Sequence, residues 1–174
     1  MGSKLLAAAV VMALSAWTIT AQAATTATAA LKDPAGLDAG AATLTQGPKG
    51  VVVHMTVKGL TPGWHAAHFH EVGDCSPPDF KTAGGHVHTQ ATHVHGLLNP
   101  DANEAGDLPN LFVGADGTGA AEFFSTTVSL DGVDGQPTLL DKDGAALVIH
   151  ANPDDFVTQP IGGAGARIAC GVIR

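Results

Sequence analysis

Histidine is the residue type whose spacing in this sequence most clearly indicates chemistry. The stretch GWHAAHFHEVGDCS, residues 63–76, places three histidines within six positions, and seven of the nine histidines fall between residues 65 and 95. Neutral imidazole is the commonest protein ligand for copper and zinc, so a cluster this dense predicts a metal site. The nine are His54, His65, His68, His70, His86, His88, His93, His95 and His150.

Position within the expected strands separates these histidines. His68 and His70 are two apart, so on a strand they point to one face and can share one ion. His65 is at odd spacing and would face away. His54 lies on the polar side of an alternating run and is expected to be exposed to solvent. His150 ends an apolar run, where a lone histidine is usually a satisfied core residue, but the cluster elsewhere favours a ligand.

Two carboxylates belong near the histidines. Asp107 sits in the tight turn AGDLP, which would hold its side chain rigidly, and Asp154 follows His150 by four residues. Ligating histidines usually donate their second N–H to a carboxylate or carbonyl, which fixes the tautomer, and Asp154 is well placed for that role. The alternative for both is an ordinary loop acid.

The sequence predicts that short β-strands position these side chains. Glycine and proline interrupt the chain often, and no strongly amphipathic, capped helix is evident, so we expect an all-β sandwich or barrel. Two polar segments, 71–119 and 151–166, do not follow the strand pattern, and we expect them to be functional loops. The expected strands are 25–31, 41–45, 51–57, 120–130, 145–150 and 168–173.

The N-terminus predicts export. Lys4, the apolar run 5–17 and the small residues 21–23 form the layout of a secretory signal peptide over residues 1–23, with an uncleaved membrane anchor as the alternative. The domain would then occupy residues 24–174. Its sixteen acidic and seven basic residues disfavour nucleic acid and anionic membranes as partners.

Two cysteines remain for this exported domain. Cys75 and Cys170 are an even pair, which in an oxidising compartment predicts one disulfide. The alternative is that one thiol joins the histidines as a soft metal ligand.

Several motifs together resemble the bacterial periplasmic copper-zinc superoxide dismutase family. The matching pieces are PGWHAAHFHEVGDCS, FKTAGGH, HGLLNP, AGDLPN, LVIHANPDD and QPIGGAGARIACGVI, which cover nearly all of the domain in the family's order. The resemblance implies an eight-stranded Greek-key β-barrel with long metal-binding loops. It also implies an enzyme that converts two superoxide anions to oxygen and hydrogen peroxide by Cu(II)/Cu(I) cycling.

The resemblance assigns a role to each matching residue. It implies copper ligands at His68, His70, His86 and His150, with His86 bridging to zinc and moving a proton in catalysis. It implies zinc ligands at His95 and Asp107, an anion-binding arginine at Arg167, an aspartate linking the two metal sites at Asp154, and the disulfide Cys75–Cys170.

One zinc ligand of the family pattern is missing. Where the family has His in HAGDLP, this chain has Glu104, and the altered segment VHTQATHVH adds His88 and His93. Three outcomes are open: Glu104 ligates zinc, His88 or His93 does so, or zinc binds weakly or not at all. The sequence favours the third outcome, a weakened or absent zinc site, so copper is expected and zinc is uncertain.

A second class of function also stays open at this point. The same fold could serve as an exported copper/zinc-binding buffer without catalysis, although retention of Arg167 favours the enzyme. The expected partner is superoxide, and the expected assembly is a monomer or a homodimer.

Overall fold

The protein is described by a computed structural model that places residues 24–132 and 135–174. Nine strands and one 3₁₀ turn make up the regular structure of these residues. The expected signal peptide, 1–23, lies outside them. The elements are β1 (Thr26–Lys32), β2 (Asp38–Gly47), β3 (Gly50–Val57), β4 (Gly63–His65), β5 (Ala67–His70), η1 (Lys81–Ala83), β6 (Leu111–Val113), β7 (Gly119–Ser125), β8 (Ala145–His150) and β9 (Arg167–Ile173).

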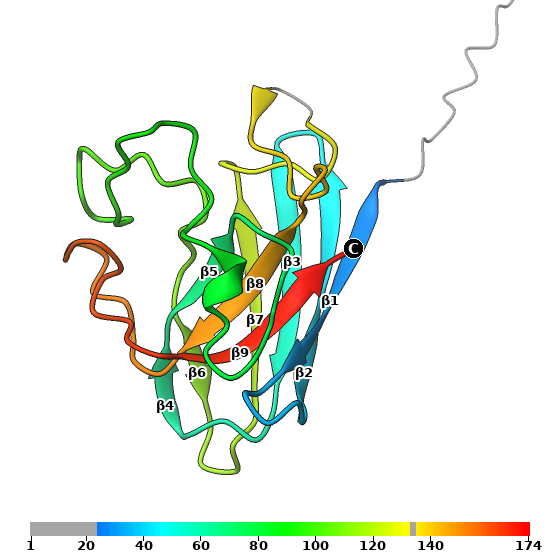
Figure 1. Cartoon of the computed structure of the whole chain (residues 1–174), viewed down its shortest axis with the longest axis vertical. Coiled ribbons are helices and arrows are strands. Elements are labelled where there is room, and N and C mark those ends of the chain that lie inside the picture. The colour runs from blue at the N-terminus through cyan, green and yellow to red at the C-terminus, as the bar shows by residue number, and fades with distance from the viewer. Residues whose placement is uncertain (1–23, 133–134) are drawn as a thin grey trace, which may run out of the picture.

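The strands form an antiparallel barrel (Figure 1). Seven of them pair in the order β5-β8-β9-β1-β2-β3-β7, and β4 pairs with β6. Strand β6 packs beside β7, and β4 runs into β5 after the single residue Ala66. Counting β4 and β5 as one interrupted strand therefore closes the ring with eight strands, and the expected all-β Greek-key barrel is confirmed.

Alternating side chains explain why the strands close around a core. Along β3, Val51, Val53 and Met55 are buried, whereas Val52 and His54 face outward. Period-two alternation places one row of a strand against the interior and the other toward water. His54 is exposed, as expected, and its Nδ1 lies 3.6 Å from an oxygen of Glu122 on β7.

Two long connections bring the remaining chemistry to the barrel. The β5–β6 connection, residues 71–110, and the β8–β9 connection, residues 151–166, both leave strands at the side of the barrel that carries the histidines. The expected disulfide Cys75–Cys170 is present and fastens the first connection to β9. Because both cysteines are in this bond, the alternative of a thiol ligand is wrong.

Some boundaries differ from the expected ones. Strand β7 ends at Ser125 rather than at residue 130, and the short strand β6 lies within the segment expected to be loop. Within residues 24–132 and 135–174 no helix has the length and apolar character needed to cross a membrane.

Candidate metal centre

Four histidines converge beside the barrel from two strands and a loop. Antiparallel pairing of β5 with β8 places His68 opposite Val148, and His70 forms an isolated bridge with His86 of the loop. His150 is the last residue of β8. All four side chains are buried, and one ring nitrogen of each lies within 4.8 Å of those of the others.

The tautomer of three of these histidines is set by a hydrogen bond on the far side of the ring. His68 Nε2–H donates to Asp154 Oδ2 (2.9 Å), His70 Nδ1–H to the Gly84 carbonyl (3.0 Å) and His150 Nδ1–H to the Gly165 carbonyl (3.1 Å). The opposite nitrogen of each ring then carries a free lone pair.

The free nitrogens identify what the cluster can hold. Of the described residues, four buried side-chain nitrogens have no hydrogen-bond partner: His68 Nδ1, His70 Nε2, His86 Nε2 and His150 Nε2. An unpartnered buried polar atom is costly, so four that converge on one point fit a bound cation with a preference for imidazole. The donor set therefore fits copper.

Burial keeps these copper-side rings neutral. Desolvation lowers the pKa of His68 to about 4, of His70 to about 2 and of His150 to about 3, with neighbouring positive groups adding to the effect at the last two. At neutral pH their lone pairs are consequently available to a metal rather than occupied by protons.

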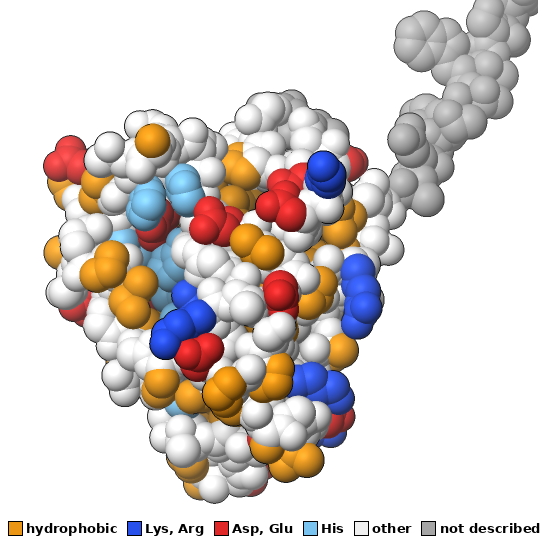
Figure 2. Space-filling model, in the orientation of Figure 1, with side chains coloured by type: hydrophobic (Ala, Val, Ile, Leu, Met, Phe, Trp, Pro, Cys, Tyr) orange, Lys and Arg blue, Asp and Glu red, His pale blue; other side chains and the backbone are white. Residues whose placement is uncertain are grey.

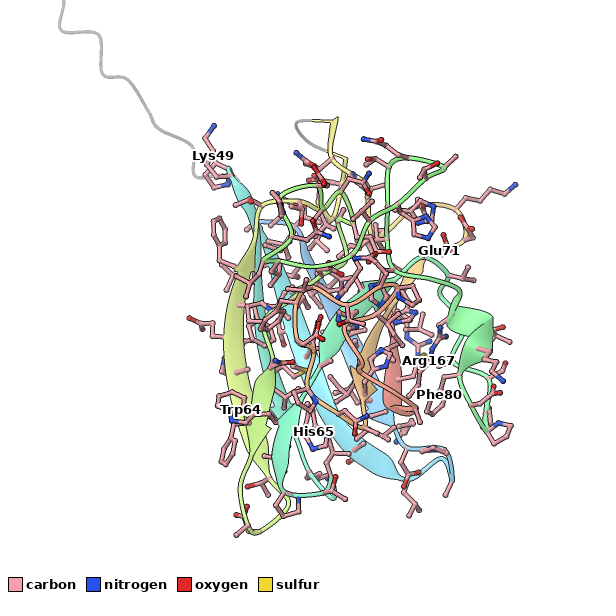
Figure 3. All side chains as sticks on the ribbon, turned by 90° about the vertical axis from the view of Figure 1, so that its left-hand side faces the viewer. Lys49, Trp64, His65, Glu71, Phe80 and Arg167 are labelled. Atoms are coloured by element: carbon pink, nitrogen blue, oxygen red, sulfur yellow. A yellow bond between two sulfur atoms is a disulfide. The ribbon has the colours of Figure 1, made fainter. Side chains whose placement is uncertain are left out.

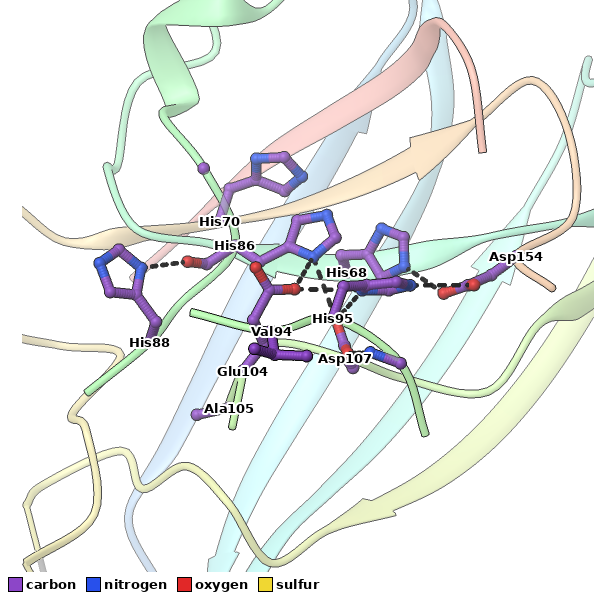
Figure 4. A network of polar contacts seen from close by, with 12 residues as sticks. His68, His70, His86, His88, Val94, His95, Glu104, Ala105, Asp107 and Asp154 are labelled. Atoms are coloured by element: carbon purple, nitrogen blue, oxygen red, sulfur yellow. Dashed lines mark hydrogen bonds and ion pairs between the residues drawn. The ribbon is translucent and has the colours of Figure 1, made fainter. Parts of the chain in front are cut away.

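A second set of ligand atoms lies on the other side of His86 (Figure 4). His86 Nδ1 is 2.8 Å from Glu104 Oε2 and 3.0 Å from Asp107 Oδ1, and His95 Nδ1 is 3.1 Å and 2.9 Å from the same two oxygens. Two nitrogens and two oxygens thus form a compact four-atom group. In a tetrahedral zinc site the ligand atoms stand about 3.3 Å apart, so this group fits zinc after an expansion of a few tenths of an ångström.

Electrostatics distinguishes the two groups of ligands. Burial opposes charge on His95, but hydrogen bonds to Asp107, Asp154 and Glu104 prevail and raise its pKa to about 11. Although burial disfavours its ionised form, hydrogen bonds from His86 and His95 hold the pKa of Asp107 well below its usual range. In the metal-free state, protons on imidazole therefore supply the positive charge that zinc would bring.

Asp154 joins the two groups. Its Oδ2 accepts from His68 Nε2–H, and its Oδ1 lies 3.0 Å from His95 Nε2. The backbone N–H of Asp154 donates to Asn110 Oδ1 (2.8 Å), which anchors the β8–β9 connection to the loop before β6. Asp154 therefore contacts one histidine of each group.

Arg167 borders a pocket that opens onto the copper-side histidines. The pocket encloses about 230 Å³, and its lining includes His70, His86, His150 and Arg167. The guanidinium donates to the carbonyls of Phe80 and Gly84, both at 2.6 Å. Figure 3 labels Arg167 beside Phe80. These two bonds fix its position, and its remaining N–H groups are available to an anion.

Comparison with known proteins identifies the family of this chain. The family model described as copper/zinc superoxide dismutase (SODC) matches residues 38–173. The chain belongs to the copper/zinc superoxide dismutase family. It is 66% identical over 148 residues to "Superoxide dismutase [Cu-Zn]" of Caulobacter vibrioides, with 85% of each chain covered. It is 43% identical over 136 residues to "Superoxide dismutase [Cu-Zn] 2" of Aquifex aeolicus, with 78% of each covered.

Solved structures agree with this assignment. A superoxide dismutase-like protein from Bacillus subtilis is 35% identical and superposes with a TM-score of 0.76, covering 83% of this chain and 96% of that one. The chain is therefore a superoxide dismutase, an oxidoreductase that acts on superoxide and whose family uses copper and zinc. The alternative of a metal buffer without catalysis is not favoured.

The extra histidines of this family member lie outside both ligand groups. His65 is buried, with Nδ1 2.7 Å from the His150 carbonyl oxygen and Nε2 2.8 Å from the Thr61 carbonyl oxygen. It therefore connects the backbone at His150 to the backbone at Thr61. His88 and His93 stack on each other with ring centroids 4.4 Å apart. The Gly84 and Gly165 carbonyls, which orient ligands, were missed because backbone acceptors leave no side-chain signal in a sequence.

Proposed function

We propose that His68, His70, His86 and His150 hold the copper of this superoxide dismutase. The observation that carries the proposal is the set of four buried, unpartnered ring nitrogens that converge between β5, β8 and the loop. Bound copper would supply one-electron redox chemistry, alternating between Cu(II) and Cu(I) as two superoxide anions become oxygen and hydrogen peroxide.

The protein's own groups would bind the anion and deliver protons. Arg167 keeps two guanidinium N–H groups on backbone carbonyls and offers the others to superoxide in the pocket. A charge-assisted hydrogen bond of this kind orients the anion toward the histidines. His86 also lines that pocket, and its Nε2 has no hydrogen-bond partner, so this nitrogen, when it is not bound to copper, is the atom at which the chain can hold a proton beside the substrate.

We further propose that Glu104 takes the fourth zinc position beside His86, His95 and Asp107. Its carboxylate is buried and lies at hydrogen-bond distance from both zinc-side imidazoles, whereas His88 and His93 stack with each other instead. Glutamate is an accepted zinc ligand. Compared with a histidine, it lowers the charge of the occupied zinc site by one unit, and we expect the altered geometry to weaken zinc binding.

We infer that the enzyme acts in the periplasm after removal of residues 1–23, as a monomer or a homodimer. The support for export is the signal-peptide pattern together with the Cys75–Cys170 disulfide, which suits an oxidising compartment. Mass spectrometry of the protein recovered from the periplasm would test the cleavage site, and sedimentation would give the assembly.

Superoxide decay tests the centre directly. The disulfide-bonded protein is loaded with copper alone, metal content is measured, and decay of superoxide is followed before and after zinc is added. Fast decay with copper alone means that zinc is dispensable, and decay only after zinc means that the Glu104 site completes the enzyme. Confirmed copper on the four histidines without decay in either condition would contradict the proposed centre.

A further inference from the structure

Gln159 joins the two long connections of the barrel from a position outside both ligand groups. It belongs to the β8–β9 connection, and its side-chain amide bonds with both backbone groups of His95 in the β5–β6 connection. Gln159 Oε1 accepts from the His95 N–H at 2.9 Å, and Gln159 Nε2–H donates to the His95 carbonyl at 2.8 Å. A second hydrogen on Nε2 is within reach of the Val157 carbonyl at 3.0 Å. Only one orientation of the amide satisfies these partners, so Gln159 fixes the backbone that carries the His95 ring.

A second amide makes the reciprocal link. Asn110 ends the β5–β6 connection, and it bonds with both backbone groups of Asp154 in the β8–β9 connection. Asn110 Oδ1 accepts from the Asp154 N–H, and Asn110 Nδ2–H donates to the Asp154 carbonyl, both at 2.8 Å. Between these two amides the Leu98 N–H donates to the Phe156 carbonyl at 3.1 Å. Each connection therefore holds the backbone of one site residue that belongs to the other.

The part of the β8–β9 connection that contains Gln159 is closed on itself. The Asp155 N–H donates to the Gly162 carbonyl at 2.9 Å, and the Gly162 N–H donates to the Thr158 carbonyl at 2.7 Å. A surface loop whose ends meet in this way is a compact unit. The hydrogen bonds of Gln159 with His95 therefore restrain the whole segment 155–162.

The same segment supplies a wall of the pocket beside Arg167. Pro160 and Ile161 line this pocket together with His93 and Glu104 of the β5–β6 connection. Figure 2, in the orientation of Figure 1, shows histidine side chains at the surface where the two connections face each other. The position of one connection relative to the other therefore sets the shape of the space that an anion enters.

We propose that Gln159 is a positioning residue that ties this pocket wall to the zinc-side ligand His95. The proposal rests on the zinc group described above and assigns the residue through which occupation of that group acts on the pocket. An ion on the His95 ring would restrain the backbone that Gln159 holds, and Gln159 would restrain Pro160 and Ile161. Gln159 is exposed, so water competes for its amide, and its bonds persist only while both partners stay in place.

Hydrogen–deuterium exchange tests this link without any measurement of dismutation. The metal-free protein is compared with the protein loaded with zinc alone, and zinc should slow the exchange of backbone amides in residues 155–162. Gln159→Met keeps the length of the side chain but neither hydrogen bond to His95, so the slowing should be lost. Its zinc affinity, measured by competition with a chelating dye, should fall by roughly tenfold. A purely structural role would lower the melting temperature and leave the response to zinc in place.

The pocket wall has a readout of its own. Azide, a small anion that binds Cu(II) and changes its absorption spectrum, is titrated into the copper-loaded protein before and after zinc is added. Zinc should tighten azide binding in the unaltered protein, because a wall that is already ordered costs less to arrange around an anion. In Gln159→Met with equal copper content, zinc should leave the azide affinity unchanged. An equal response to zinc in the two proteins would overturn the link to the pocket.

Gln46 on β2 offers a matched control. Its Oε1 accepts from the Leu130 N–H at 2.7 Å, its Nε2–H donates to the Gly47 carbonyl at 2.8 Å, and neither partner belongs to a ligand group. Gln46→Met should therefore change neither the zinc affinity nor the zinc-dependent exchange of residues 155–162. Gln159→Asn, whose side chain is shorter by one methylene group, repeats the main test with a polar residue and should also lose the slowing.

The outcomes separate this proposal from the zinc group on which it rests. Zinc that fails to bind the unaltered protein would overturn both. Zinc that binds without slowing the exchange of residues 155–162 would overturn the role of Gln159 alone. The same conclusion follows if the slowing survives in Gln159→Met, or if Gln46→Met removes it equally.

Discussion

At the scale of single residues, Glu104 brings a second carboxylate, beside that of Asp107, to the imidazoles of His86 and His95. Glu104 Oε2 lies 2.8 Å from His86 Nδ1 and 3.1 Å from His95 Nδ1. The carboxylate therefore belongs to the second set of ligand atoms and does not point to solvent. Backbone pairing of Glu104 with His88 carries it there, and the Thr127 hydroxyl donates to the next carbonyl, that of Ala105, at 2.8 Å. Compared with a histidine at this position, Glu104 changes the charge of the site while keeping four potential ligands.

Glu104→Gln tests this arrangement. The amide keeps the shape but loses the charge and one strong donor atom, so zinc affinity should fall at least roughly tenfold, because even the loss of an outer partner of a ligand has such an effect. Copper content should not change. Zinc affinity is measured by competition with a chelating dye, and Glu122→Gln, an exposed glutamate, serves as the control.

The same position allows a converse experiment. Glu104→Gln with unchanged zinc affinity and an intact fold would mean that zinc does not use this carboxylate. Glu104→His restores the family's ligand type, and a rise in its zinc affinity would show that glutamate is the weaker ligand.

Arg167 yields a prediction about the rate. Arg167→Ala removes charge-assisted hydrogen bonds to the anion, worth about 1.5–3 kcal/mol, so dismutation should slow by roughly one to two orders of magnitude. The four ring nitrogens that we propose as copper ligands belong to other residues, so the copper content should stay the same. Pulse radiolysis of the copper-loaded protein measures the rate. Equal activity in Arg167→Ala would remove the role assigned to the arginine, and Arg167→Lys, which keeps the charge, should fall between the two.

At the scale of elements, the β8–β9 connection positions Asp154 through a glycine. Gly162 has φ of +59°, and a β-carbon there would collide with the Asp154 carboxylate and stand 3.0 Å from His95 Nε2. Gly163 has φ of +71° and open space around it. The two neighbours therefore need the same unusual backbone conformation but differ in packing.

This pair gives a matched prediction. Gly162→Ala should displace Asp154 and weaken zinc binding beyond any effect of Gly163→Ala, because both substitutions carry a similar backbone strain and only the first meets the carboxylate. Zinc competition and thermal unfolding of both variants measure the difference. Identical values for the two would show that the contact between residue 162 and Asp154 has no influence on the site.

The sequence predicted the strands better than the connections, for physical reasons. Strands β1, β2, β3, β8 and β9 were expected within a few residues because alternation or continuous apolar character marks them. Strand β6 was missed because Leu111–Val113 is only three residues long and lies between polar loops. Asp154 was singled out by its spacing from His150, whereas Gly84 and Gly165 act through backbone atoms, which any residue type possesses.

At the scale of the whole molecule, the metal-free protein should be most stable near neutral pH. His68, His70 and His150 have pKa values of about 4, 2 and 3 when folded, against 6.5 for ordinary histidine. Below about pH 6.5 the unfolded chain therefore binds protons that the folded protein does not, and stability falls as the pH is lowered.

His95 acts in the opposite direction. Its folded pKa of about 11 exceeds 6.5, so the stability that it contributes is complete below about pH 6.5 and declines as the pH rises toward 11. Together the two effects predict a maximum in the melting temperature of the metal-free protein near pH 6.5. Calorimetry between about pH 4.5 and 9 would show it, and a melting temperature that rises steadily across this range would contradict the assigned protonation states.

His86 and Asp154 each contact both ligand groups, which has a consequence for how the protein fills with metal. His86 offers Nε2 to one group and Nδ1 to the other, and Asp154 orients His68 with one oxygen and contacts His95 with the other. A metal ion bound by one ligand group would therefore order residues that also serve the other group, so the two metal-binding equilibria would be thermodynamically linked. Such linkage is reciprocal. A cell starved of zinc would hold copper in this protein less tightly, by the same factor by which copper starvation loosens zinc.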